Sequence, residues 1–323
     1  MTNASVALPS CTVISCVSPV RQQRRSVCIK CCLQQNSVLE ELKSLGVRPK
    51  KSLGQNFLVS EAVLSDIVNA ASVQAGDHIL EIGPGLGTLT DRLVKLGATV
   101  LAIEKDDLFA KHLEKKFLEV EQVAVVHADV LAVRQLPEMI RTFQPAHGAK
   151  VKVVANIPYN ITSDLLSVLL PMRQVIESLY LLLEKGAAVR LTQARPGDKD
   201  YRAMSVILGL YCQARLCFGV SREAFHPVPG VDSAVAEFNL HEQLDKRVEE
   251  HEDDFVAFVS AAFSMKRKTL INNLKSWNAA SLPNVVSCLD SGGLSPQIRA
   301  EALDVSAFIA LYTCLRVHHI SRK

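Results

Sequence analysis

Three glycines at positions 83, 85 and 87 lie in the run Glu81–Thr88, between a strand-like segment and a helix-like segment. Glycine permits a tight turn and lets the backbone approach a bound ligand closely. The spacing is GxGxG rather than the GxGxxG of dinucleotide-binding folds, because position 88 is Thr. The loop has no Lys or Arg and no GK[ST] sequence, so it is not a P-loop that holds phosphates.

Two carboxylates follow the next two predicted strands. Glu104 ends one strand, 21 residues after Gly83, where a carboxylate can accept both ribose hydroxyls of an adenosine ligand. Asp129 follows the next strand and is placed to reach the adenine amine. The combination predicts a nucleoside ligand at the carboxyl edge of a sheet. S-adenosylmethionine fits this prediction because, unlike a nucleotide, it has no phosphate for the loop to hold. On these residues alone, a nicotinamide-dependent oxidoreductase and a plain glycine turn with a solvated Glu104 stay open.

A second motif, Asn156-Ile157-Pro158-Tyr159, ends a fourth predicted strand. The Asn156 side-chain oxygen and the Pro158 carbonyl could both accept hydrogen bonds from an exocyclic adenine amine and direct its lone pair at a methyl carbon. Tyr159 offers a face on which a base can stack. A strand-terminating turn would use the same residue types, so the spacing alone leaves both interpretations open.

Short β-rich runs alternate with helical segments around these motifs. The predicted helices include 86–95 and 107–117, and the predicted strands are 78–82, 99–103, 123–126, 152–155, 179–183, 216–220 and 231–240. This alternation predicts an α/β fold, a doubly wound Rossmann-like sheet with helices on both faces. Beyond Asp254 the pattern is helical, with helices expected over 255–274 and 305–317 and a break at Gly292-Gly293.

The first 38 residues contain Arg21, Arg24, Arg25 and Lys30, six Ser and five of the nine Cys, but no Asp or Glu. Such a leader is typical of an organelle transit peptide. Its first 20 residues carry no charge, which favours a plastid, with a mitochondrion as the alternative. The five leader cysteines lack zinc-ligand spacing, so no metal site is predicted, and Cys212, Cys217, Cys288 and Cys314 are expected to be reduced.

Charge marks a boundary later in the chain. The whole chain has 36 Lys and Arg and 33 Asp and Glu; four of the basic residues lie in the leader, which leaves 32 against 33. A nucleic-acid partner therefore cannot be inferred from net charge and would need a local basic surface. Residues 241–254 contain seven acids and are predicted to be a linker. We expect an α/β domain over 39–240 and an all-helical domain over 255–323.

The motifs together resemble the ribosomal RNA adenine dimethyltransferases. The segments that carry the resemblance are Lys51–Leu58, Glu81–Thr90, Asn156–Thr162, Phe225–Val235, Phe263–Leu274 and Arg299–Glu301, in the order of that family. The run Leu96–Asp106 is most similar to the plastid branch, in agreement with the leader. The resemblance implies S-adenosylmethionine-dependent dimethylation of N6 on two adjacent adenosines near the 3′ end of small-subunit ribosomal RNA.

The resemblance also assigns roles to matching positions. Asn156, Pro158, Tyr159 and Phe225 would be catalytic, with Tyr159 and Phe225 on either side of a flipped adenine. Composition alone favours Phe225 as a core residue; the family match reverses this. Cofactor contacts would come from Asn56, Leu58, Gly83, Gly85, Glu104, Asp129 and Asn156, and phosphate contacts from Lys50, Lys51, Lys266, Arg267 and Lys268.

Two departures lie beside the expected RNA face. This chain has Glu184-Lys185-Gly186 where the family commonly has Gln-Lys-Glu, and Tyr201–Ser205 reads Tyr-Arg-Ala-Met-Ser instead of Tyr-Gly-Arg-Leu-Ser. The partner expected is small-subunit ribosomal RNA or a preribosomal particle, with the chain as a monomer and with no membrane or DNA partner. Alternatives are the related large-subunit RNA methyltransferases and a non-catalytic organellar ribosome-assembly or transcription factor.

Overall fold

The computed structural model describes residues 38–46, 55–146, 148–275, 277 and 282–320. Their main sheet has the strand order β4-β3-β2-β5-β6-β9-β7. β2 (His78–Ile82), β3 (Thr99–Glu104), β4 (Val123–His127), β5 (Val151–Asn156) and β6 (Ile176–Glu184) run parallel. All seven predicted strands are present, and the strand order reverses beside β2, which is where open α/β sheets bind ligands.

The last two strands depart from the parallel pattern. β7 (Cys212–Val220) and β9 (Ser233–Leu240) are joined without a crossover helix, and β9 lies between β6 and β7, antiparallel to both. The chain between them passes through β8 (Phe225–His226), which pairs with β1 (Phe57–Leu58) in a separate two-stranded sheet. This small sheet brings Asn56 to the carboxyl edge of the main sheet.

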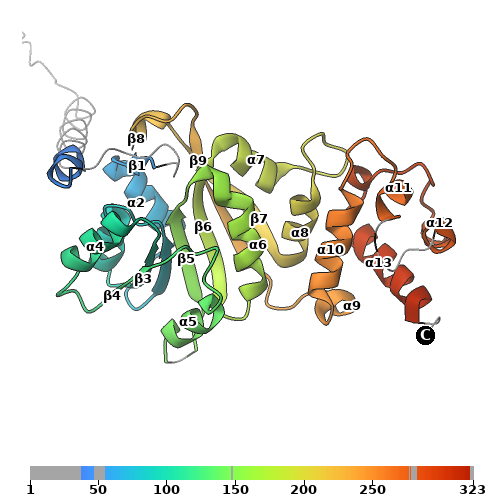
Figure 1. Cartoon of the computed structure of the whole chain (residues 1–323), viewed down its shortest axis with the longest axis horizontal. Helices are drawn as coiled ribbons and strands as arrows, with labels where there is room; N and C mark the ends of the chain where they lie inside the picture. The colour runs from blue at the N-terminus through green and yellow to red at the C-terminus, as the bar shows by residue number, and fades with distance from the viewer. Residues whose placement is uncertain (1–37, 47–54, 147, 276, 278–281, 321–323) are drawn as a thin grey trace, which may run out of the picture.

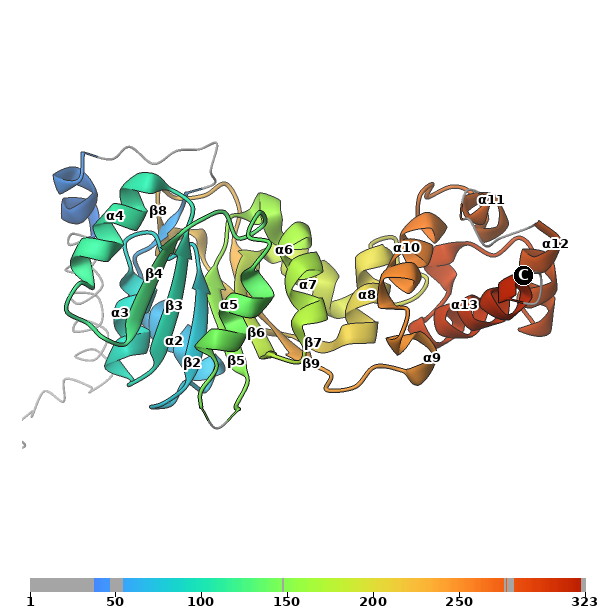
Figure 2. The same ribbon diagram turned by 60° about the horizontal axis from the view of Figure 1, so that its bottom comes forward.

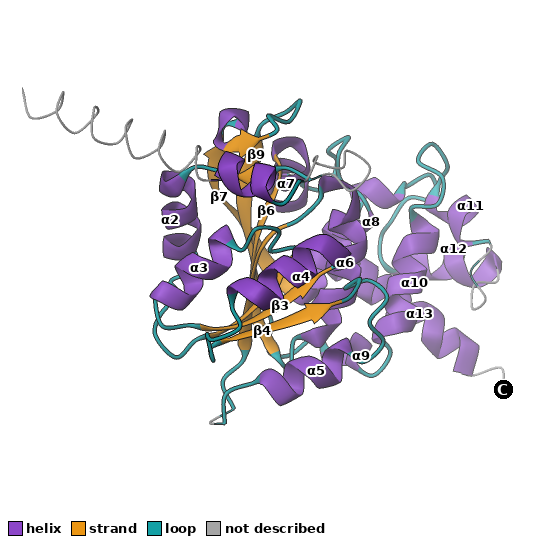
Figure 3. Cartoon of the chain, turned by 60° about the vertical axis from the view of Figure 1, so that its left-hand side comes forward, coloured by secondary structure: helices purple, strands orange, loops and turns teal. Residues whose placement is uncertain are grey.

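Alternate side chains of each strand enter different cores, which is why helices cover both faces. Leu80 and Leu101 belong to one cluster, with α5 (Leu136–Phe143), α6 (Thr162–Leu169) and α8 (Ala203–Tyr211). Ile79 and Val100 belong to the other, with α2 (Glu61–Ala70) and α3 (Thr88–Lys95). Figure 3 shows α2 and α3 on one side of the strands and α6 and α8 on the other. The predicted doubly wound α/β architecture is confirmed.

The helical region follows the sheet at the opposite end from β4 (Figure 1). It contains α9 (Lys246–Glu249), α10 (Glu252–Ala262), α11 (Leu270–Leu274), α12 (Leu282–Ser291) and α13 (Val305–Ile320). The single helix expected over 255–274 is wrong, because the chain turns between α10 and α11. Asn273 explains the turn: its buried Nδ2 donates to the carbonyls of Ala262 at 2.6 Å and Met265 at 3.2 Å, which satisfies the end of α10.

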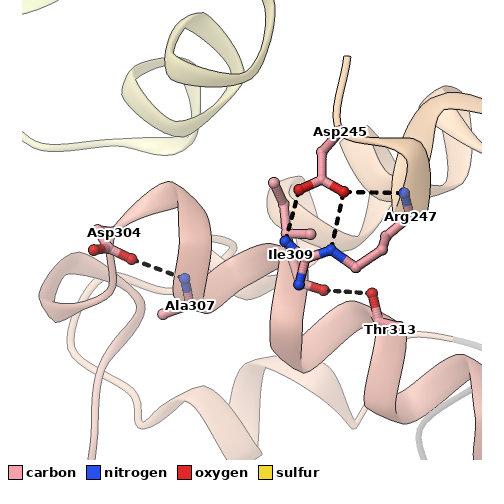
Figure 4. A network of polar contacts seen from close by, with 6 residues as sticks. All are labelled: Asp245, Arg247, Asp304, Ala307, Ile309 and Thr313. Atoms are coloured by element: carbon pink, nitrogen blue, oxygen red, sulfur yellow. Dashed lines mark hydrogen bonds and ion pairs between the residues drawn. The ribbon is translucent and has the colours of Figure 1, made fainter.

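The acidic stretch is not an extended linker. Leu244 and Val248 are buried in the same core cluster as the sheet, so the two regions share a continuous core. Asp245 caps α9, and its two carboxylate oxygens accept hydrogen bonds from Nε and Nη2 of Arg247 at 2.9 and 2.6 Å (Figure 4). At the start of α13, Asp304 accepts the Ala307 N–H at 2.8 Å.

Three of the remaining acids in that stretch face the sheet region or another helix. Arg173, 6% exposed, follows α6 and lies 3.1 Å from Glu249 and 3.0 Å from Glu252. The Tyr312 hydroxyl of α13 donates to Asp254 at 2.9 Å. Glu249 and Glu252 therefore tie the helical region to the sheet region, whereas Asp254 ties α10 to α13 within the helical region.

Two smaller expectations also need correction. Val38, placed in the leader, begins a helical segment and is 1% exposed in a core cluster, so it belongs to the folded protein. Cys288 and Cys314 form a disulfide between α12 and α13, whereas Cys212 and Cys217 are free thiols. None of the helices among the described residues is both long and apolar enough to span a bilayer.

Candidate functional site

A cavity of about 250 Å³ opens at the carboxyl edge of the sheet, where the strand order reverses. It is lined from the glycine loop after β2, the end of β3, the segment after β4, the end of β5 and the residues before β1. Among the sequence-predicted residues, it brings together Asn56, Leu58, Gly83, Gly85, Glu104, Asp129, Asn156, Pro158 and Tyr159. The cavity therefore gathers every predicted cofactor-binding and catalytic residue except Phe225, and their roles stay predictions.

The glycine loop needs its glycines for conformation and for space. Gly83 and Gly85 have φ of +67° and +59°, a left-handed backbone that other residues adopt at a cost. A Cβ on Gly85 would lie 3.2 Å from the Phe57 ring, and the backbone beside Gly83 faces the Asn156 carbonyl. The turn thus packs against Phe57 and the end of β5, and the N–H groups of its three glycines are held by the Ile103 carbonyl, Glu104 and the Pro84 carbonyl.

Glu104 ties this loop to the next strand. Its Oε2 accepts the Gly85 N–H at 3.0 Å and its Oε1 accepts the Asp106 N–H at 2.8 Å. Burial raises the pKa of Glu104, and the two backbone donors oppose that shift by favouring the carboxylate. A carboxylate held in this way is placed to accept hydrogen bonds from a ribose, as the sequence predicts.

Asp129 follows β4, the strand next to β3, and is more exposed to solvent than Glu104. Lys105 Nζ lies 2.7 Å from its Oδ2, and the Leu131 N–H donates to its Oδ1 at 3.1 Å. The hydrogen bond from Lys105 is the main reason that the pKa of Asp129 is lowered. The carboxylate stays ionised at neutral pH and can accept a hydrogen bond from an adenine amine.

Asn156 sits at the end of β5 with its side chain oriented by the segment before β1. Its Nδ2 donates to the Asn56 carbonyl at 3.2 Å. Because the amide nitrogen is committed to this bond, the amide oxygen is the atom that can accept from a substrate amine. The Pro158 carbonyl accepts the Ile161 N–H at 3.2 Å, and a carbonyl has a second lone pair for the same amine.

Tyr159 lines the cavity beside the Asn156 side of the site. It begins a short 3-10 turn, Tyr159–Ile161, and its hydroxyl shares a 2.7 Å hydrogen bond with the Ser233 hydroxyl of β9. Burial raises the pKa of Tyr159, so the phenol is neutral at physiological pH. The ring is therefore fixed at both ends and can serve as a stacking face.

Phe225 does not line the cavity. Its side chain is 1% exposed and packs in the core with Leu58, Leu64 and Tyr180, because β8 pairs Phe225 with Leu58 of β1. In this structure Phe225 is a core residue, as its composition suggested and contrary to the stacking role implied by the resemblance. Of the two predicted aromatics, Tyr159 alone is at the cavity.

The predicted RNA contacts divide into two groups. Lys50 and Lys51 lie outside the described residues. Lys266, Arg267 and Lys268 are exposed in the turn after α10, and Lys266 Nζ donates to the Lys199 carbonyl at 3.1 Å. In Figure 1, α10 runs upward from α9, so the turn after α10 lies at the top of the molecule. The carboxyl edge of the sheet lies at the top as well, where α7 follows β6.

An open groove adjoins the Ser233 end of β9 and reaches the loop that contacts Lys266. It is lined by residues of α7 (Lys185–Gln193), the loop before α8 and the segment before β9. Glu184 and Gly186, which differ from the family's usual Gln-Lys-Glu sequence, also line it. Its cations are Lys185, Arg190 and Lys199, but four acids also line it. The charge of this groove is therefore mixed.

Sequence reasoning missed two polar residues of the site. Glu81, 2% exposed, lines the cavity and accepts the Thr90 hydroxyl at 2.7 Å, and burial raises its pKa to about 8. Its signal was available, because an acid within a buried strand needs a partner. Ser233 gave no signal before the fold placed β9 beside Tyr159. No group of three or more His, Cys, Asp or Glu suited to a metal ion occurs in the described part of the chain.

Comparison with known proteins agrees with this geometry. The family model described as ribosomal RNA adenine dimethylase matches residues 46–288. The chain is 33% identical over 316 residues to a ribosomal RNA small subunit methyltransferase, chloroplastic, of Arabidopsis thaliana, covering 95% of this chain and 92% of that protein. It is 35% identical over 278 residues to ribosomal RNA small subunit methyltransferase A of Protochlamydia amoebophila, covering 84% and 93%.

Solved structures give the same result. A dimethyladenosine transferase from Plasmodium falciparum superposes with a TM-score of 0.61 and 26% identity, covering 79% of this chain and 95% of that one. The 23S rRNA methyltransferase ErmE, at 23% identity and a TM-score of 0.57, covers 81% and 100% and supports the fold. The fold, the cavity and the family match over three quarters of the chain agree: this chain belongs to the ribosomal RNA adenine dimethylase family.

Proposed function

We propose that this enzyme uses S-adenosylmethionine to dimethylate N6 of two adjacent adenosines near the 3′ end of small-subunit ribosomal RNA, in the plastid stroma. S-adenosylmethionine supplies a methyl group that is already activated: the amine lone pair takes it as the carbon–sulfur bond breaks and a proton leaves to solvent. The relative from Arabidopsis thaliana, whose name is chloroplastic, supports the compartment together with the acid-free leader.

The residues present fit this cofactor. Glu104 is a buried carboxylate bound to the glycine loop, and Asp129 is an ionised carboxylate after the neighbouring strand. Gly83 and Gly85 supply the left-handed backbone of the loop that lines the cavity. No lysine or arginine lies in the loop to hold a phosphate. These features support a nucleoside without phosphates over a dinucleotide.

Orientation of the Asn156 amide is the observation that carries the proposed reaction. An exocyclic adenine amine is a poor nucleophile because its lone pair is delocalised into the ring. Acceptors at Asn156 Oδ1 and the Pro158 carbonyl would each take one N–H and aim the lone pair, while Tyr159 supports the ring. The protein thus contributes orientation rather than acid–base chemistry.

The RNA would extend from the cavity toward the helical region. Lys266, Arg267 and Lys268 are exposed on the same side as the cavity, and Lys266 contacts the loop that borders the groove. Phosphates bound there would hold the strand while the target adenine is flipped onto Tyr159. The mixed charge of the groove favours the helical turn as the main phosphate contact.

Substitution of Asn156 tests this assignment. We expect Asn156→Ala to lower kcat by about 100-fold, a magnitude typical of losing an oriented acceptor, with cofactor affinity changed far less. Asn239→Ala, on the exposed side of β9 away from the cavity, is the matched control. Full methyl transfer by Asn156→Ala would show that this residue does not orient the amine.

A further inference from the structure

The N-terminal helix, residues 38–44, packs against the wall of the cofactor cavity. It lies before the region matched by the family model, which begins at residue 46. Val38 and Leu42 are 1% and 4% exposed and form one cluster with Phe57, Leu86 and Phe109. In Figure 2 this blue segment lies beside α4 (Asp107–Lys116), which carries Phe109.

The residues beneath this helix also face the cavity. Phe57, Leu86 and Phe109 are all among the lining residues, and the rings of Phe57 and Phe109 lie 5.3 Å apart. Phe57 in turn sits against Gly85, whose N–H is bound by Glu104. Three side chains therefore have the N-terminal helix on one side and the ligand space on the other.

A polar contact fixes the same helix to the glycine loop. Glu41 Oε1 lies 3.0 Å from His112 Nε2 and 3.8 Å from Lys116 Nζ, both on α4. Lys116 Nζ also donates to the Leu86 carbonyl at 2.8 Å and lies 2.8 Å from Asp91 of α3. Lys116 thus links the N-terminal helix, the glycine loop and the first turn of α3.

We propose that the N-terminal helix is a working part of the cofactor site, in which Leu42 and Glu41 position Phe57, Phe109 and the glycine loop for binding. The inference rests on the proposed use of S-adenosylmethionine and adds a positioning element outside the family match. Because wall and helix share the same side chains, docking of the helix and binding of the cofactor are thermodynamically coupled.

Cofactor titration of the full chain tests the coupling. Glu41→Ala should weaken S-adenosylmethionine binding about 3- to 5-fold, the effect of a half-buried ion pair, and Leu42→Ala about 10-fold or more. Glu40→Ala is the matched control, since Glu40 is the adjacent residue and its side chain is exposed. In turnover, the Glu41 variant should raise KM for the cofactor and leave KM for RNA unchanged.

Reciprocity supplies a second readout that a purely structural helix would not give. Saturating S-adenosylhomocysteine should slow amide exchange of Leu45, whose N–H donates to the Glu41 carbonyl at 3.1 Å, in the unaltered protein. Equal cofactor affinity of Glu41→Ala and Glu40→Ala, or no change in exchange at Leu45, would overturn the inference and leave the cofactor assignment intact. Failure of the unaltered protein to bind the cofactor would overturn both.

Discussion

At the scale of single residues, the site depends on the hydrogen bonds that its polar atoms already make within the protein. Asn156 uses its amide nitrogen on the Asn56 carbonyl, Tyr159 uses its hydroxyl on Ser233, and Glu104 holds the Gly85 N–H. Each bond removes one conformational freedom and leaves one face or atom for the ligand. Such preorganisation suits a reaction that needs alignment more than proton transfer.

Glu81 gives a prediction for the pH dependence of stability. Burial raises its pKa from 4.5 to about 8 in the folded protein, so the folded state holds a proton that the unfolded state releases at lower pH. The free energy of unfolding should therefore fall as pH rises from about 4.5 to 8, by up to about 1.4 kcal/mol per pH unit from this group. Glu81→Gln should be flatter over that window in denaturant titrations.

Comparing the pH dependence of unfolding free energy between the unaltered protein and Glu81→Gln separates the contribution of this carboxyl from that of the other titrating groups. Gln keeps the side-chain size and can still accept the Thr90 hydroxyl, which donates to Glu81 at 2.7 Å. Identical slopes for the unaltered protein and Glu81→Gln would show that Glu81 does not hold its proton above its ordinary pKa.

At the scale of elements, the helical region is attached through a close helix pair. A Cβ built on Gly209 of α8 would lie 2.5 Å from Val305 Cγ2 of α13, so only glycine allows this approach. Alanine ordinarily stabilises a helix relative to glycine by about 1 kcal/mol. Here the contact reverses that preference, because the obstructing atom belongs to a stiff β-branched side chain.

We expect Gly209→Ala to lower the free energy of unfolding by about 1–3 kcal/mol, as overpacking does. The double variant Gly209→Ala/Val305→Ala should recover much of the loss, since it removes the obstructing methyl groups. Thermal unfolding of the unaltered protein, Gly209→Ala, Val305→Ala and the double variant gives the coupling energy. Additive effects of the two substitutions would contradict the close approach.

The disulfide is a second link between elements. Cys288 and Cys314 join α12 to α13 across 26 residues of sequence, so reduction should destabilise the helical region by about 2–4 kcal/mol. A dithiol reductant should lower the denaturant midpoint of the unaltered protein and leave that of Cys288→Ser unchanged. An equal shift in both proteins would show that the effect does not come from the Cys288–Cys314 disulfide.

Sequence predicted the elements around the glycine loop better than those of the helical region. The strands β2, β3, β4 and β5 end within two residues of their predicted positions, because each is a largely apolar run that ends at, or just before, a glycine or a polar residue. The break after α10 was missed, since Asn273 caps it from the next helix and no local residue signals it. The resemblance, not the composition, assigned Phe225 to the site; its burial comes from pairing with β1, 167 residues earlier in the sequence.

At the scale of the whole molecule, the carboxyl edge of the sheet and the turn after α10 lie on one side (Figure 1), and a continuous core joins the two regions. The distance between them is therefore held by packing rather than by a linker. The Arg173 contacts with Glu249 and Glu252 reinforce this junction. A substrate that contacts both places must be large, as a ribosomal RNA is.

Charge reversal in the turn separates RNA contacts from cofactor contacts. The triple variant Lys266→Glu/Arg267→Glu/Lys268→Glu should raise KM for RNA by at least about 10-fold and reduce the salt dependence of RNA binding, while S-adenosylmethionine affinity stays unchanged. Lys246→Glu, on the exposed side of α9 at the other end of α10, is a control for general charge. Unchanged RNA affinity of the triple variant would remove this turn from the substrate surface.

The most direct test of the account is transfer of labelled methyl groups from S-adenosylmethionine to small ribosomal subunits that lack the modification, with the site mapped by reverse-transcription stops. We predict stops at two adjacent adenosines near the 3′ end, with two methyl groups on each, and loss of both in Asn156→Ala. Cofactor binding without transfer to any small-subunit adenosine would contradict the proposed reaction and favour a role in ribosome assembly.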